Sequence, residues 1–137
     1  MNEAIYQQAL KDLAQAAHGA GRLAGHDGEA LRDNPLCGDR VRIEIVRNAG
    51  LITALAQETR GCLLARASAS LLGLRVPGQT PEQIAAVARA LREMLNGGEL
   101  AADAWPEWAM FQPVRGHRSR HGCVLLPLEA LLQALAA

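Results

Sequence analysis

Three cysteines and one aspartate are the residues of this sequence best suited to metal or sulfur chemistry. Cys37 and Asp39 lie two residues apart in the motif NPLCGD at 34–39, whose glycine suits a turn that lets thiol and carboxylate face one ion. Cys62 and Cys123 complete the set. Three thiolates and one carboxylate match the four-coordinate preference of Zn²⁺, and thiolates also hold iron-sulfur clusters. The ligand set therefore leaves zinc and iron-sulfur as alternatives.

The elements expected around these cysteines place them at boundaries. A helix is predicted to start at Cys62, and Cys123 is expected just ahead of the final helix, because Pro127 is tolerated only near a helix start. At such positions free backbone N–H groups and the helix dipole favour a thiolate. A hard carboxylate oxygen among soft thiolates holds a soft metal less firmly, which suits a site that releases its cargo.

Plainer interpretations compete with the metal site. The cysteines are separated by 25 and 61 residues, without a Cys-x-x-Cys pair, and a free cysteine is often simply a buried residue. His121 is a further candidate ligand or proton carrier, or a solvated loop histidine. The basic segment 115–121 is either a solvated surface or a docking face for an acidic partner.

The remaining pattern predicts the elements that must carry the site. The first half of the chain is predicted to form a helix over 2–17 with Asn2 as N-cap, a loop over 18–39 with at most one short edge strand, and a β-hairpin of 41–46 and 51–56. The second half is predicted to form a helix over 80–96 capped by Thr80 and Gln83, a loop over 105–120 and a final helix after Cys123. Trp105 and Trp108 are expected in the core or a lid.

Length and charge limit the classes of protein. The 137 residues suit a single domain over 1–137, and 14 basic residues balance 14 acidic ones, which argues against a nucleic-acid partner. The N-terminus lacks the apolar stretch of a signal peptide, and no apolar run reaches membrane-spanning length. We therefore expect a cytoplasmic protein without a membrane partner, whose three cysteines stay reduced.

Taken together, the cysteine motifs resemble the IscU/SufU (NifU N-terminal) scaffold family. The likeness is carried by NPLCGD at 34–39, by Gly61-Cys62 running into ASAS at 67–70, and by CVLLP at 123–127, within a stretch from about Gly21 to the C-terminus. It implies an α+β fold of the SufE/NifU kind, with a small antiparallel sheet of about three strands and helices packed on one side. It also implies one zinc or 2Fe-2S cluster site, with these ligands: Cys37, Asp39, Cys62 and Cys123.

Members of this family accept sulfur from a cysteine desulfurase, and they either assemble a cluster for apo iron-sulfur proteins or pass the sulfur on. The long segment between Cys62 and Cys123 is similar to SufU-like members, which hold zinc and use the first cysteine as acceptor. By that likeness Cys37 is the sulfur acceptor. His121 departs from the IscU pattern, because Gly122 separates it from the third cysteine.

Three functions remain open at this point. The leading one is a scaffold or sulfur-transfer protein rather than a conventional enzyme. The second is a zinc-dependent sulfurtransferase that only activates the desulfurase and assembles no cluster. The third is a structural zinc domain that acts as an adaptor through its basic segment.

Overall fold

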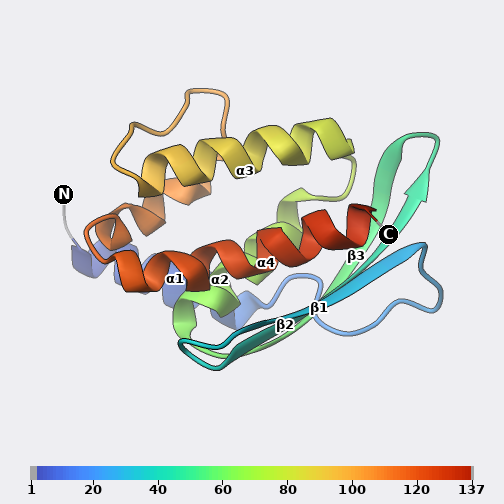
Figure 1. Cartoon of the computed structure of the whole chain (residues 1–137), viewed down its shortest axis with the longest axis horizontal. Coiled ribbons are helices and arrows are strands. Elements are labelled where there is room, and N and C mark those ends of the chain that lie inside the picture. Colours follow the sequence, from blue (N-terminus) through green and yellow to red (C-terminus); the bar gives the residue numbers. More distant parts are fainter. Residues whose placement is uncertain (1–2, 137) are drawn as a thin grey trace.

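The computed structural model describes residues 3–136, with side chains from residue 6 onward. The predicted N-cap Asn2 lies outside the described residues. No helix in the described part of the chain is long and apolar enough to cross a membrane. The elements, labelled in Figure 1, are α1 (Glu3–Ala16), β1 (Gly28–Asn34), β2 (Asp39–Asn48), β3 (Leu51–Arg60), α2 (Leu63–Arg75), α3 (Pro81–Leu95), the 3₁₀ helix η1 (Pro106–Val114) and α4 (Arg118–Ala136).

The three strands form one antiparallel sheet in the order β1-β2-β3. The predicted hairpin is confirmed: β2 and β3 are joined at Ala49 and Gly50, which both have positive φ, of 53° and 81°. A two-residue hairpin turn that follows the twist of its strands requires this conformation. The strands run further than predicted, and the single edge strand expected in the first loop is β1, with seven residues.

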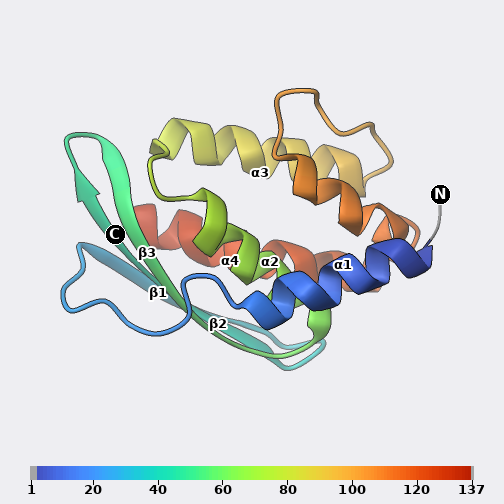
Figure 2. The ribbon, with the colours of Figure 1, turned by 180° about the vertical axis from the view of Figure 1, so that it is seen from behind.

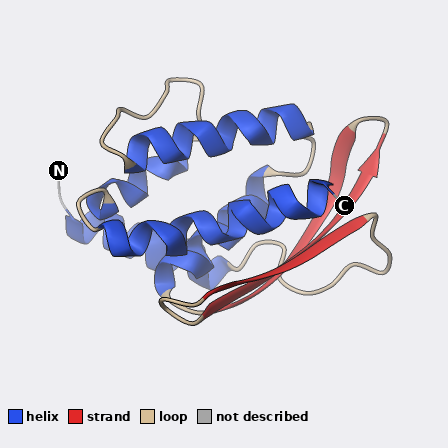
Figure 3. Ribbon diagram, viewed as in Figure 1, coloured by secondary structure: helices blue, strands red, loops and turns tan. Residues whose placement is uncertain are grey.

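One face of the sheet is apolar and carries the helices. Val41, Ile43 and Ile45 alternate along β2 and are fully buried, as a half-buried strand requires. Helix α4 packs on β1 and β2, and α2 packs on β3. In the outer layer, α1 packs on α2 and α3 packs on α4. Figures 2 and 3 show all helices on the same side of the sheet. The predicted α+β architecture is confirmed.

Helix α3 has the start predicted from its sequence. The Thr80 hydroxyl accepts a hydrogen bond of 3.1 Å from the Gln83 N–H, and the Gln83 side chain accepts one of 2.8 Å from the Thr80 N–H. This reciprocal pair satisfies two N–H groups that the helix leaves free. Its apolar stripe, which includes Ile84 and Leu91, is buried.

The segment after α3 differs from the prediction. Residues 106–114, expected in a loop, form η1, in which Trp108 is fully buried and stacks on Trp105 at 5.9 Å between ring centroids. The two tryptophans are core residues. Apolar contact with the core orders this stretch, although Pro113, inside η1, has no N–H to donate to a helical hydrogen bond.

The position of the last helix corrects a second prediction. Helix α4 begins at Arg118, so that Cys123 and Pro127 both lie inside it rather than at its start. Pro127 has no N–H to donate to the carbonyl of Cys123, four residues earlier. The adjacent carbonyl of Val124 accepts a hydrogen bond of 2.7 Å from the buried Ser68 hydroxyl of α2. Packing between α2 and α4 thus keeps a proline within a continuous helix.

Candidate metal and sulfur site

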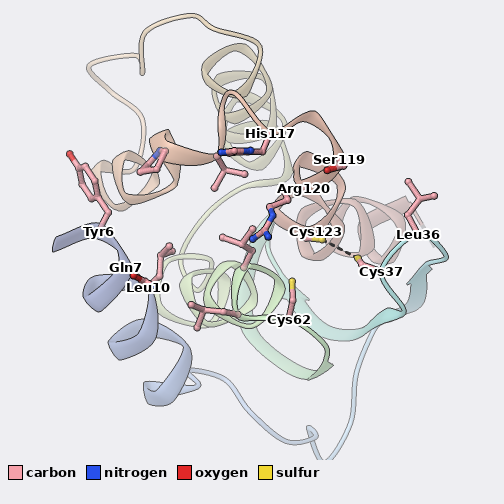
Figure 4. A pocket seen from close by; sticks show the side chains of 14 residues that line it. Tyr6, Gln7, Leu10, Leu36, Cys37, Cys62, His117, Ser119, Arg120 and Cys123 are labelled. Carbon is pink, nitrogen blue, oxygen red and sulfur yellow. Dashed lines mark hydrogen bonds between the residues drawn. The ribbon is translucent and has the colours of Figure 1, made fainter. Parts of the chain in front are cut away.

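The four predicted site residues come from three separate parts of the chain. Cys37 lies in the turn between β1 and β2, and Asp39 is the first residue of β2. Cys62 is the N-cap of α2, as predicted, and its side chain does not cap the helix. Cys123 lies in the second turn of α4. The fold brings these residues, distant in sequence, to one end of the sheet. Figure 4 shows the three cysteines together there.

The ligand atoms of three of these residues form a tight group. The sulfur atoms of Cys37 and Cys123 lie 3.0 Å apart, and the Cys37 sulfur lies 2.9 Å from Oδ2 of Asp39. All three ligand atoms lie within 4.8 Å of one another. The Cys62 sulfur is outside this group but lies 3.4 Å from the same Oδ2. The carboxylate is therefore the shared neighbour of all three cysteines.

Asp39 is held as a carboxylate at the centre of the site. It is 1% exposed, and this burial raises its pKa. Hydrogen bonds from the Cys37 thiol, from the backbone N–H of Cys62 and from the other two thiols together outweigh the burial, so the pKa of Asp39 lies below its ordinary value. A buried anion that needs no protonation is suited to bind a cation.

The three cysteines differ in their exposure to solvent. Cys37 is exposed, Cys62 is partly exposed and Cys123 is buried. Burial raises the pKa of the Cys123 thiol, and hydrogen bonds with Cys37 and Asp39 raise it further. The expectation that a helix start would help to ionise Cys123 is wrong, because this residue lies inside α4. Cys37 is the most exposed of the three cysteines.

This donor set fits a metal. Cys37, Asp39 and Cys123 already present two sulfurs and one oxygen at close range, and Cys62 can supply a third sulfur beside the same carboxylate. Three sulfurs and one oxygen suit zinc, and sulfur-rich sets also suit iron-sulfur clusters. The arrangement is consistent with either, and the donor atoms alone do not choose between them.

Two further residues support the site, and the sequence reasoning assigned neither a role. Asn34 is buried, accepts a hydrogen bond from the Leu36 N–H at 3.1 Å and directs its Nδ2 at the Cys123 sulfur, at 3.9 Å. Gly61 leaves room for Asp39, because a Cβ at this position would lie 2.2 Å from Oδ1. Both residues belong to the cysteine motifs, which was the only sequence signal of their importance.

His121 is turned away from the sulfurs. Its Nε2 lies 3.2 Å from the carbonyl oxygen of Val114 and 3.0 Å from that of Arg115, both acceptors. Nε2 therefore carries a hydrogen and donates hydrogen bonds to the carbonyl oxygens of Val114, in η1, and of Arg115, in the turn after it. In this arrangement His121 fastens α4 to η1, and it is not part of the group of metal-binding atoms.

A cavity of about 860 Å³ opens beside the sulfurs. Its wall is mostly apolar and comes from α1, the first turn of α2, η1 and α4. Leu36, next to Cys37, is 86% exposed at its edge. The cavity is lined by Tyr6, Gln7, Leu10, Leu36, Leu63, Leu64, Pro113, Val114, His117, Ser119, Arg120 and the three cysteines (Figure 4). A molecule that enters it reaches the thiols directly.

A second group of possible metal ligands, one histidine and two glutamates, lies on the outer face of the sheet. His26, Glu29 and Glu44 place one ligand atom each within 4.8 Å of one another. The guanidinium of Arg42 is bonded to the carboxylates of both Glu29 and Glu44. A positive charge therefore already occupies the position that a cation would take, and this cluster is an ion-pair network.

The amino-acid sequence of the chain is similar to those of known proteins. The model of the NifU-like N-terminal domain matches residues 5–123. The iron-sulfur cluster assembly scaffold protein IscU of Thermotoga maritima is 24% identical over 96% of this chain and 92% of its own length. The zinc-dependent sulfurtransferase SufU of Bacillus subtilis is 26% identical over 71% of this chain and 65% of its own. Both IscU and SufU names occur, so the SufU-like subgroup stays a prediction.

Solved structures agree with the sequence comparison. The N-terminal part of a NifU-like protein from Brucella abortus superposes with a TM-score of 0.90 at 28% identity, over 96% of this chain and 92% of that one. A putative SUF-system scaffold from Fervidobacterium islandicum shares the fold, with a TM-score of 0.89 at 22% identity over 98% and 99% of the two chains. The chain belongs to the NifU-like N-terminal domain family of iron-sulfur cluster assembly scaffold proteins.

Proposed function

We propose that this protein accepts sulfur from a cysteine desulfurase at Cys37 and either assembles it into an iron-sulfur cluster or relays it. One observation carries the proposal: the most accessible thiol of the site lies 3.0 Å from a second thiol and 2.9 Å from a buried carboxylate, beside an open cavity. The protein acts as a single domain over residues 1–137, in the cytoplasm, with apo iron-sulfur proteins as recipients of the product.

The transfer step uses the exposure of Cys37. The Cys37 thiolate attacks the outer sulfur of the persulfide on the desulfurase, and a new sulfur-sulfur bond forms. The sulfur-sulfur bond of the donor breaks, and the donor cysteine leaves as a thiolate. Asp39 accepts the hydrogen bond of the Cys37 thiol before the reaction. The proton that Cys37 loses when it attacks ends on the departing thiolate of the donor.

A metal at this site would be held by Cys37, Asp39, Cys62 and Cys123. Bound zinc stabilises thiolates and so lowers the pKa of its cysteine ligands. Iron that arrives with sulfur is cargo, and the two neighbouring sulfurs of Cys37 and Cys123 are suited to receive it. The carboxylate is the one oxygen ligand of the set, and it is the ligand that a soft metal gives up first.

Labelled-sulfur transfer from a desulfurase tests the assignment of Cys37. Cys37→Ser should abolish the transfer and leave the far-ultraviolet circular dichroism unchanged, because residue 37 is exposed. Cys62→Ser is the comparison variant: it should still accept one sulfur at Cys37 and should bind metal weakly. Transfer to Cys37→Ser at the wild-type rate would refute the proposal.

The zinc-dependent sulfurtransferase is the second candidate, because a relative of that name matches 71% of this chain. Anaerobic reconstitution separates the two. A scaffold develops a persistent visible absorption and transfers the cluster to an apo-ferredoxin. A zinc sulfurtransferase retains one zinc per chain, passes on persulfide sulfur and develops no such absorption.

A further inference from the structure

Among the described residues that line the cavity beside the thiols, Arg120 is the one with a permanent charge. Among the side chains that the structure describes, from residue 6 onward, no aspartate or glutamate lines this cavity, and the remaining lining residues are apolar, sulfur-containing or neutral polar, apart from His117. Asp39 lies behind the thiols, where it is 1% exposed. Arg120 thus presents a positive charge within reach of a molecule that approaches the sulfurs.

The Arg120 guanidinium has no partner among the described residues. No ion pair or side-chain hydrogen bond joins it to them, whereas arginines such as Arg22, Arg40 and Arg75 form ion pairs with acidic side chains. Figure 4 shows the Arg120 side chain extending into the cavity beside the three cysteines. Arg120 belongs to the first turn of α4, the helix that carries Cys123, so the fold fixes its backbone relative to the thiols.

We propose that this cavity binds small persulfides that carry a carboxylate, with the carboxylate on Arg120 and the outer sulfur directed at Cys37. The cavity, of about 860 Å³, has the size of a small-molecule site, and its apolar wall accommodates the carbon chain of an amino-acid or peptide thiol. A guanidinium is suited to such a ligand, because its planar fork matches a carboxylate. The inference rests on the proposed function, since Cys37 must accept sulfur.

The reaction needs no further oxidant or reductant. The Cys37 thiolate attacks the outer sulfur of the bound persulfide, a sulfur-sulfur bond forms to Cys37, and the sulfur-sulfur bond of the donor breaks. The small thiol leaves as a thiolate, still bearing its carboxylate. Arg120 is a positioning residue in this step, because it holds the part of the donor that does not react.

The test compares two persulfides that differ only in charge, prepared from mercaptopropionate and from its uncharged amide, mercaptopropionamide. The gain of one sulfur atom at Cys37 is followed by mass spectrometry on the full chain. We expect the carboxylate donor to react about two- to fivefold faster than the amide donor, the size of effect that one charge pair gives at an exposed arginine. In Arg120→Gln this ratio should fall to about one, and Arg120→Lys should keep part of it, because lysine retains the charge but lacks the planar fork.

Arg118→Gln is the matched control, because Arg118 is an exposed arginine of the same helical turn that does not line the cavity. This variant should keep the wild-type ratio. Equal rates for the two donors, or a ratio that Arg118→Gln lowers as much as Arg120→Gln does, would overturn the inference. So would transfer from the desulfurase without transfer from either small persulfide. Failure of every donor, the desulfurase included, would instead overturn the proposed function.

Discussion

The backbone N–H of Cys62 donates a hydrogen bond of 2.8 Å to Oδ1 of Asp39. This bond joins the start of β2 to the N-cap of α2, and it leaves Oδ2 facing the thiols of Cys37 and Cys62, at 2.9 and 3.4 Å. The two oxygens of the carboxylate thus have different hydrogen-bond partners. One oxygen fixes the distance between sheet and helix, and the other is presented to the site.

Gly61→Ala should weaken metal binding by displacing Asp39. A Cβ at residue 61 would lie 2.2 Å from Oδ1 and 2.7 Å from Cγ of that side chain, so the carboxylate must move. Mutation of a residue that supports a metal ligand typically costs about 10- to 100-fold in metal affinity. Zinc titration against a competing chelator measures the loss. Gly25→Ala is the control, since nothing lies within 4 Å of the added carbon there. An unchanged affinity in Gly61→Ala would contradict the assignment of Asp39 as a ligand.

Zinc should stabilise the folded chain, because the four ligands meet only when the sheet, α2 and α4 are assembled. At about 100 times its dissociation constant, zinc should add about 2.7 kcal/mol to the free energy of unfolding. For a chain of 137 residues this corresponds to a rise of roughly 10 °C in Tm. Differential scanning calorimetry measures it, with magnesium as the control cation. An equal rise in Asp39→Asn would speak against the site.

Ser68→Ala should destabilise the packing of α2 on α4. The Ser68 hydroxyl donates to the carbonyl of Val124, and both residues are fully buried. Loss of one buried hydrogen bond costs about 0.5 to 1.5 kcal/mol, and Pro127 already leaves the neighbouring carbonyl without its helical donor. Urea unfolding measures the loss. Ser119→Ala, at an exposed position of α4, should change the free energy of unfolding by less than about 0.5 kcal/mol.

Glu44 should make stability fall in acid. The backbone N–H of Leu23 donates a 2.9 Å hydrogen bond to this buried carboxylate, and Arg42 and His26 add favourable charge. Together they outweigh burial and hold the pKa of Glu44 below its ordinary 4.5. A pKa lowered by folding means that the stabilisation is complete above pH 4.5 and is lost as the pH falls through the folded-state pKa.

The Glu44 contribution is measured by comparing the wild type with Glu44→Gln in urea unfolding at a series of pH values. The difference in free energy of unfolding should be largest near neutral pH and should shrink as the pH falls below 4.5. Parallel curves for the two proteins across that range would show that Glu44 does not contribute to acid sensitivity.

Local patterns determined the elements whose signals are short-range. The hairpin turn needs two residues with positive φ, and the start of α3 needs a capping pair three residues apart, so both could be read from neighbouring residues. The same holds for Cys62 as an N-cap. The cysteine motifs also indicated the family, because several separate motifs occurred in one order.

Tertiary packing decided the remainder. Pro127 signals a helix start locally, yet α4 begins nine residues earlier, at Arg118, because contacts with the sheet and α2 outweigh one missing hydrogen bond. The burial of Cys123, the central place of Asp39 and the exposure of Cys37 follow from the same packing. The sequence alone could name the four candidate site residues, whereas their distances, burial and protonation depend on groups that are far apart in the chain and meet only in the folded protein.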